Sequence, residues 1–117
     1  MNSIFIGRHG ESAACKYLKQ NGYKILKRNY KKKYGEIDII AQKSDLISFV
    51  EVKTRSSKDF GLACEAVTKA KKDRIIKTAQ TYINEYKIDC NFSFDVIEIY
   101  HNFGKIEKIE HIECAFS

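Results

Sequence analysis

The chain has 117 residues, enough for one hydrophobic core, and we expect residues 1–117 to form a single domain. Hydrophobic residues make up 44% and charged residues 31%, and no stretch approaches the 18 consecutive apolar residues of a membrane-spanning helix. The net charge of +6 favours polyanionic partners such as nucleic acids, because positive charge attracts them and releases their counterions.

Two further features bear on location and metal content. The N-terminus lacks the basic segment and long apolar run of a secretory signal, so we expect a cytoplasmic protein. The cysteines are widely spread and form no Cys-x-x-Cys pair, so the sequence does not indicate a structural zinc site. We expect free, buried thiols at Cys15, Cys64, Cys90 and Cys114.

An amphipathic helix is predicted over residues 8–21, ending at Asn21-Gly22. Its apolar positions are Ala13, Ala14, Tyr17 and Leu18. Glu11 lies on the side of the helix expected to pack. An acid in the first turn complements the helix dipole, which is the more common explanation, and a ligand role is the alternative.

Strands and one further helix follow in chain order. Alternating apolar residues predict strands over 23–30, 35–42 and 46–54, and later over 92–100 and 105–112. Residues 56–61 are predicted to form a loop, 63–67 a short helical turn, and 68–86 a long helix with Thr68 as its N-cap. The order α-β-β-β-α-β-β indicates an α/β protein with a mixed sheet flanked by helices.

Charged residues interrupt two of these strands. Alternation places Glu51 and Lys53 on the face of their strand that carries Ile47 and Phe49. Asp38 shares a face with Glu36 and Ile40 in the preceding strand, while Ile37 and Ile39 point the other way. If the two strands pair, Asp38, Glu51 and Lys53 converge at one edge of the sheet.

This set of side chains suits phosphodiester hydrolysis. Two nearby carboxylates repel each other unless a cation neutralises them, and Mg²⁺ binds one or two carboxylates while keeping most of its waters. A bound ion acidifies water and balances charge on a phosphate, and an adjacent lysine adds a positive charge. The simpler explanation is an exposed Glu-x-Lys pair beside a half-exposed hairpin. The residues alone leave both explanations open.

Basic residues surround the acids in the sequence. They are expected to bind a sugar–phosphate backbone as a group, although a solvated surface explains any single one. The candidates are Lys31, Lys32, Lys33, Arg55, Lys71 and Arg74. Asp95 interrupts an apolar strand, so it is either a further site residue or a structural hydrogen-bond acceptor.

Several motifs resemble the YraN family of uncharacterised bacterial proteins over nearly the whole chain. The matching segments are Gly10-Glu11, Gly35-Glu36-Ile37-Asp38, Phe49-Val50-Glu51-Val52-Lys53-Thr54-Arg55, Phe60-Gly61, Lys71 and Phe94-Asp95-Val96. That family is similar to the PD-(D/E)xK restriction-endonuclease-like fold, and most closely to archaeal Holliday-junction resolvases. The resemblance implies that Asp38, Glu51 and Glu11 are metal ligands and that Lys53 is a catalytic lysine.

The leading hypothesis is therefore a Mg²⁺- or Mn²⁺-dependent endonuclease acting on DNA, with branched or single-stranded DNA among its candidate substrates. The resemblance also suggests a homodimer, because similar resolvases cut two strands. One alternative is a nucleic-acid-binding accessory protein that does not cleave. Another is a protein-interaction factor whose charge is incidental.

Overall fold

The computed structural model describes residues 3–59 and 67–117, with side chains from residue 9 onward. It contains one mixed sheet, two α-helices and a short 3₁₀ turn at Ser57–Asp59. The elements are α1 (Ser3–Gln20), β1 (Lys24–Lys32), β2 (Gly35–Lys43), β3 (Leu46–Ser56), α2 (Lys69–Glu85), β4 (Asn91–Asn102) and β5 (Lys105–Phe116). The predicted α/β class and the order α-β-β-β-α-β-β are confirmed.

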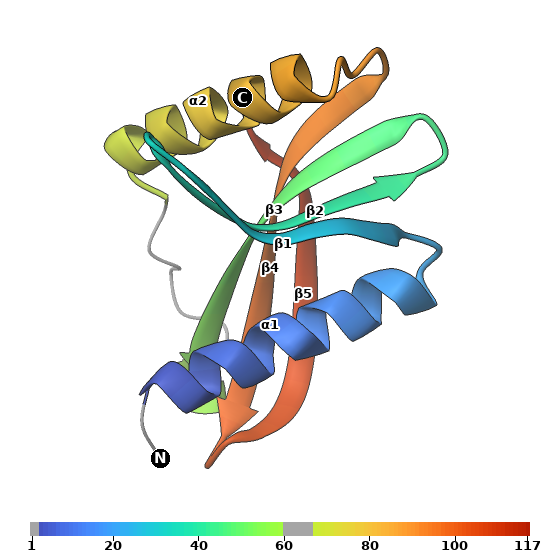
Figure 1. The fold of residues 1–117 in the computed structure, drawn as a ribbon. Helices are drawn as coiled ribbons and strands as arrows, with labels where there is room; N and C mark the ends of the chain where they lie inside the picture. Colours follow the sequence, from blue (N-terminus) through green and yellow to red (C-terminus); the bar gives the residue numbers. More distant parts are fainter. Residues whose placement is uncertain (1–2, 60–66) are drawn as a thin grey trace.

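The strands lie in the order β1-β2-β3-β4-β5. All neighbours are antiparallel except β3 and β4, which are parallel because α2 connects them across one face of the sheet. The helices cover opposite faces (Figure 1). Ala14 and Leu18 of α1 pack on Val50, whereas Ala79 and Tyr82 of α2 pack on Phe49. Neighbouring residues of β3 therefore pack in the two halves of the core, which lie on opposite faces of the sheet.

The β1–β2 hairpin bends near its middle, and the bend changes which side chains face each helix (Figure 1). Ile37 and Ile40 lie in the core beneath α2, while Ile39 lies beneath α1. The predicted shared face of Ile37 and Ile39 is therefore wrong. Strict alternation fails because the partner strand β1 is irregular: its register shifts between Ile25 and Lys27, and its backbone is left-handed at Asn29 (φ 51°).

Two predicted boundaries differ from the structure by more than two residues. Helix α1 begins at Ser3 rather than residue 8, since Ser3–Arg8 contains no proline to stop it. Strand β5 continues to Phe116 rather than residue 112, because the Phe116 ring stacks on Phe94 with centroids 5.1 Å apart. The predicted loop residues 60–61 and turn residues 63–66 lie outside the described part.

The expectation of buried thiols holds only in part. Cys15 is buried on the packed side of α1 and Cys90 is half-buried, but Cys114 is exposed. Cys114 lies in the sheet-edge strand β5, where its left-handed backbone (φ 51°) accompanies an irregular register, while Cys64 lies outside the described residues. Neither described helix is long and apolar enough to cross a membrane.

Asp95 is a structural acceptor, which resolves the two explanations left open by the sequence. Its carboxylate is 1% exposed and accepts hydrogen bonds from His111 Nε2 (2.8 Å), Ser93 Oγ (2.9 Å) and the Cys114 backbone N–H (3.1 Å). Burial alone would raise the pKa of Asp95, but these hydrogen bonds outweigh it and hold the pKa below its ordinary value. The carboxylate joins β4 to the end of β5.

We expect Asp95→Asn to lower the free energy of unfolding by about 1–3 kcal/mol at neutral pH, because a buried hydrogen-bonded charge is lost. The folded pKa is depressed, so the carboxylate stabilises the fold above about pH 4, the range of an unfolded aspartate, and less as pH falls through the folded pKa. The gap between wild type and variant in urea unfolding should shrink below that pH. A gap that grows in acid would contradict the assignment.

Candidate active site

The candidate site lies where β2 and β3 separate. Their pairing runs from Lys43↔Leu46 to Ile39↔Val50, after which β2 follows β1 toward α2 and β3 continues beside β4 (Figure 1). Asp38 Oδ2 accepts the Val52 backbone N–H at 2.8 Å, just beyond the last pair. The carboxylate thus occupies the fork between the strands and satisfies a backbone donor that has lost its neighbour in β2.

Asp38 and Glu51 bring two negative charges together in this fork. Glu51 is only 8% exposed. Burial, followed by the negative charge of Glu51, raises the pKa of Asp38 to about 7, against the hydrogen bond from Val52. The predicted convergence of Asp38 and Glu51 is therefore present in the structure, and it carries an electrostatic cost that a cation would relieve.

Glu11 reaches the same acids from α1. Burial raises the pKa of its carboxyl group; Arg28 opposes the shift, the charges of Glu36 and Glu51 add to it, and a hydrogen bond with Asp38 opposes it. Because α1 begins at Ser3, Glu11 lies in the third turn of the helix. The dipole explanation is wrong, since that effect is confined to the first turn.

Close packing of α1 on β3 allows Glu11 to reach the fork. Gly10 is buried, and a Cβ added there would collide with the Cγ2 methyl group of Thr54. A larger side chain would push α1 away from the strand and would carry Glu11 with it. The glycine before Glu11 therefore has a steric role in assembling the site.

We expect Gly10→Ala to destabilise the protein by about 1–3 kcal/mol, the usual cost of overpacking. Because the collision involves the Thr54 methyl group, Thr54→Ser in the same chain should recover much of the loss. Thermal unfolding of wild type, both single variants and the double variant measures this coupling. Strictly additive effects would show that the two residues do not collide.

Glu36 is a fourth acid at the fork, and sequence analysis did not assign it to the site. It lines a hollow of about 360 Å³ together with Gly35, Asp38, Glu51, Lys71, Arg74 and Ile75. Its charge contributes to the raised pKa values of both Glu11 and Asp38. The signal was present in the sequence, because Glu36 and Asp38 are two residues apart on one strand face.

Lys53 lies next to this hollow. A neighbouring depression of about 330 Å³ is lined by Glu51, Val52, Lys53, Thr54, Arg55 and Lys71, so Glu51 and Lys71 border both spaces. Arg55 Nε lies 3.5 Å from the buried carboxylate of Glu98. Arg55 therefore balances an internal charge as well as lying at the rim of the site.

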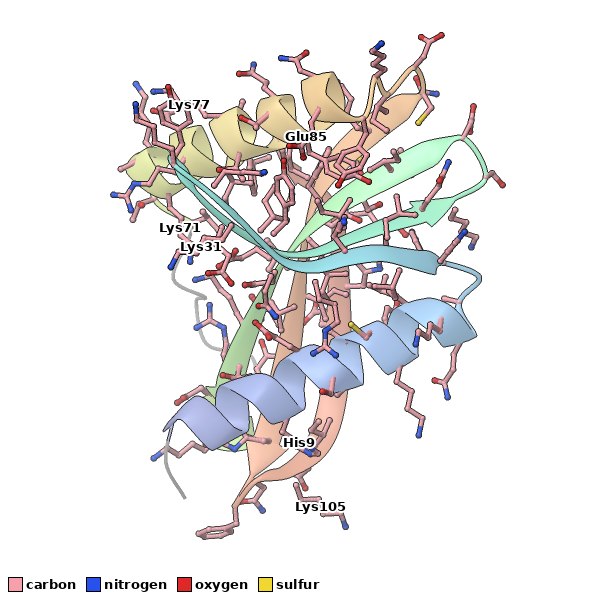
Figure 2. All side chains as sticks on the ribbon, in the orientation of Figure 1. His9, Lys31, Lys71, Lys77, Glu85 and Lys105 are labelled. Atoms are coloured by element: carbon pink, nitrogen blue, oxygen red, sulfur yellow. The ribbon has the colours of Figure 1, made fainter. Side chains whose placement is uncertain are left out.

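The basic candidates are engaged to different degrees. Lys71 Nζ is 2.5 Å from Glu51 Oε1, so this lysine neutralises a candidate ligand. Lys32 Nζ is 3.1 Å from Glu85 Oε2, which reduces the charge it offers to a partner. Figure 2 shows Lys31 and Lys71 at the end of the molecule where the β1–β2 hairpin meets the start of α2. Roles in nucleic-acid binding stay predictions.

The acids can be tested against the needs of a divalent ion. Asp38 and Glu51 both carry hard carboxylate oxygens, of which Asp38 Oδ2 accepts the Val52 N–H and Glu51 Oε1 pairs with Lys71. No group of three His, Cys, Asp or Glu residues close enough to hold a metal ion is found in residues 9–59 and 67–117. The donors fit a largely hydrated ion held by two carboxylates, as Mg²⁺ prefers, rather than a closed protein cage.

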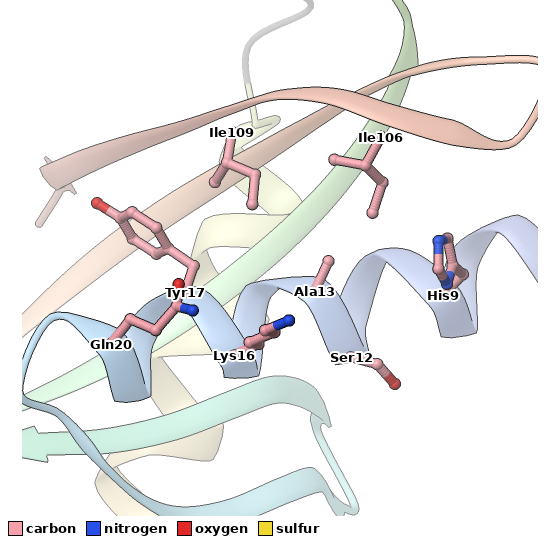
Figure 3. A pocket seen from close by; sticks show the side chains of 8 residues that line it. All are labelled: His9, Ser12, Ala13, Lys16, Tyr17, Gln20, Ile106 and Ile109. Atoms are coloured by element: carbon pink, nitrogen blue, oxygen red, sulfur yellow. The ribbon is translucent and has the colours of Figure 1, made fainter.

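A second hollow, of about 490 Å³, lies between α1 and β5. Ile106 and Ile109 project from β5 toward Ala13 and Tyr17 of α1 (Figure 3). None of its lining residues is an acid: they are His9, Ser12, Ala13, Lys16, Tyr17, Gln20, Ile106 and Ile109. This hollow therefore does not share the chemistry of the fork.

Comparison with known proteins adds an evolutionary relationship. The family model for the uncharacterised protein family UPF0102 matches residues 10–99, which include all four acids of the fork and Lys53. A UPF0102 protein from Clostridium acetobutylicum is 53% identical, with the alignment covering 94% of this chain and 92% of the relative. Another, from Caldanaerobacter subterraneus, is 47% identical, with 99% and 98% covered.

Proposed function

This chain belongs to the uncharacterised protein family UPF0102, the YraN family that its motifs resemble, and we propose that it is a metal-dependent endonuclease that hydrolyses DNA phosphodiester bonds. The observation that carries the proposal is the convergence of Asp38 and Glu51, with Lys53 beside them, at the fork between β2 and β3. Basic residues at the rim and the net charge of +6 support a polyanionic substrate.

Asp38 and Glu51 would hold the ion, with Glu11 supporting Asp38 from α1. A bound Mg²⁺ or Mn²⁺ supplies a lowered pKa for attacking water and charge balance at the phosphate. Glu51 and Asp38 present their oxygens from rigid strands, which fixes their spacing without a costly rearrangement. The hydrogen bond from Val52 further limits rotation of the Asp38 carboxylate.

Lys53 and Lys71 would supply the positive charges that accompany the reaction. Lys53 lies two residues from Glu51 on β3 and would place an ammonium group beside the phosphate, where it offsets developing negative charge. Lys71 leaves its ion pair with Glu51 and binds the incoming backbone as the substrate arrives. Arg74, from the next turn of α2, lines the same hollow and extends this contact.

We expect wild-type protein with Mg²⁺ or Mn²⁺ to cleave at least one member of a panel of duplex, single-stranded, flap and four-way-junction DNA. Asp38→Asn and Lys53→Ala should each lower the cleavage rate at least about 100-fold, because both act on charge in the transition state. Asp45→Asn, an exposed acid in the β2–β3 turn, is the matched control and should cleave like wild type. Equal rates for Asp38→Asn and wild type would contradict the assignment.

A non-cleaving accessory protein that binds nucleic acid is a second candidate, and the Lys71–Glu51 ion pair favours it. This internal cation neutralises Glu51 without an ion, so the acids have a stable arrangement of their own. Such a protein would bind DNA in a salt-sensitive manner and would show no metal-dependent turnover on any substrate of the panel.

Thermal unfolding with and without Mn²⁺ tests the ion site without a substrate. If the acids bind the ion, saturating Mn²⁺ should raise the melting temperature of wild type, because a ligand that binds only the folded state stabilises it. Glu51→Gln should remove most of this increase, whereas Glu110→Gln, an exposed acid on β5, should keep it. Equal increases in all three proteins would indicate ion binding elsewhere.

A further inference from the structure

Tyr34 is an exposed aromatic residue held between two lysines. It lies in the turn between β1 and β2 and is 48% exposed. Lys33 Nζ is 5.8 Å and Lys77 Nζ 5.5 Å from the centroid of its ring. One lysine comes from the same turn and the other from α2, so the ring connects the hairpin tip to the helix.

The position of Tyr34 relates it directly to the acidic fork. The next residue, Gly35, lines the hollow that contains Asp38. Lys77 is one turn along α2 from Arg74, which lines the same hollow. Residues three apart on a helix are about 5–6 Å apart, roughly the spacing of one or two nucleotides in a strand. Figure 2 shows Lys77 on α2 at the end where Lys71 and Lys31 lie.

Solvent exposure alone would not distinguish Tyr34 from other aromatic residues on the surface. Phe103, in the turn between β4 and β5, is 95% exposed, and single exposed aromatics at hairpin tips are common. The turn between β4 and β5, which contains Phe103, lies at the far end of the sheet from α2 (Figure 1). Tyr34 differs because its ring combines basic neighbours with a position one residue from the candidate active site.

The interaction energies of an exposed aromatic ring favour a nucleic-acid base over a lysine as the partner of Tyr34. A cation over an exposed aromatic ring contributes about 0.5–1 kcal/mol. Stacking of a nucleic-acid base on an aromatic side chain contributes about 1–3 kcal/mol. A base can therefore displace one lysine, whose ammonium group is then free to contact an adjacent phosphate.

We propose that Tyr34 is a stacking platform for an unpaired base next to the scissile phosphate, so that the substrate class is DNA with unpaired nucleotides: single strands, flaps or branch points. Bases within a perfect duplex are already stacked and cannot offer a face to the ring. This inference rests on the proposed nuclease function only in placing the base next to a phosphate that is cleaved, because stacking itself is a property of binding. Lys33 and Lys77 supply backbone contacts on either side of the base.

Binding measured in EDTA tests the proposal without catalysis. The probes are a fluorescently labelled single-stranded oligonucleotide and a labelled perfect duplex of the same length, titrated with wild type, Tyr34→Ala, Tyr34→Phe and Phe103→Ala. Tyr34→Ala should weaken single-strand binding roughly 5- to 150-fold and duplex binding less than about 2-fold. Tyr34→Phe keeps the ring and should bind like wild type, as should the distant control Phe103→Ala.

An equal loss of affinity for both probes would overturn the proposal, because it would indicate lost charge or folding rather than stacking. No loss in Tyr34→Ala would overturn it too. Parallel cleavage of the DNA panel separates this inference from the nuclease function. Cleavage by wild type with unchanged selectivity in Tyr34→Ala defeats the platform alone, whereas Tyr34-dependent binding with no cleavage defeats only the nuclease.

Discussion

The separation of β2 from β3 is the constraint on which the rest of the site depends. One hydrogen bond, from the Val52 N–H to Asp38 Oδ2, closes the fork where the ladder between these strands ends. A side-chain acceptor is needed there because the backbone donor of β3 has no partner in β2. The same carboxylate is held beside Glu51 and within reach of Glu11. Asp38 thus satisfies a backbone hydrogen-bond donor and also contributes a carboxylate to the candidate site.

Charge balance explains much of the surrounding sequence. Acids from α1, β2 and β3 meet in a partly buried space, and the raised pKa values of Asp38 and Glu11 record the cost. Lysines and arginines of α2 and of the β1–β2 hairpin offset this negative charge, most directly through the Lys71–Glu51 ion pair. A cation and a polyanion bound together would satisfy both sets, which is why metal and nucleic acid belong to one proposal.

Local patterns predicted the elements and the main acids, but not every feature of their arrangement. Alternation in β3 placed Glu51 on the face that carries Phe49, and this holds because β3 stays in unbroken register with β4. Alternation failed in β2, where the hairpin bends and puts Ile37 and Ile39 on different faces. Helix periodicity could not show that α1 approaches β3 closely at Gly10, since that contact joins residues distant in the chain. The hydrogen-bond partners that Asp95 has on β5 could not be predicted for the same reason.

Asp38 and Glu51 together form a divalent-ion site in the function proposed here. A crystal structure of the protein with Mn²⁺, using the anomalous signal of the metal, tests it most directly. We predict a Mn²⁺ ion bound by both carboxylates and completed by water, with Lys71 displaced from Glu51. An unchanged Lys71–Glu51 pair and no anomalous peak at the fork, at saturating Mn²⁺, would contradict the claim.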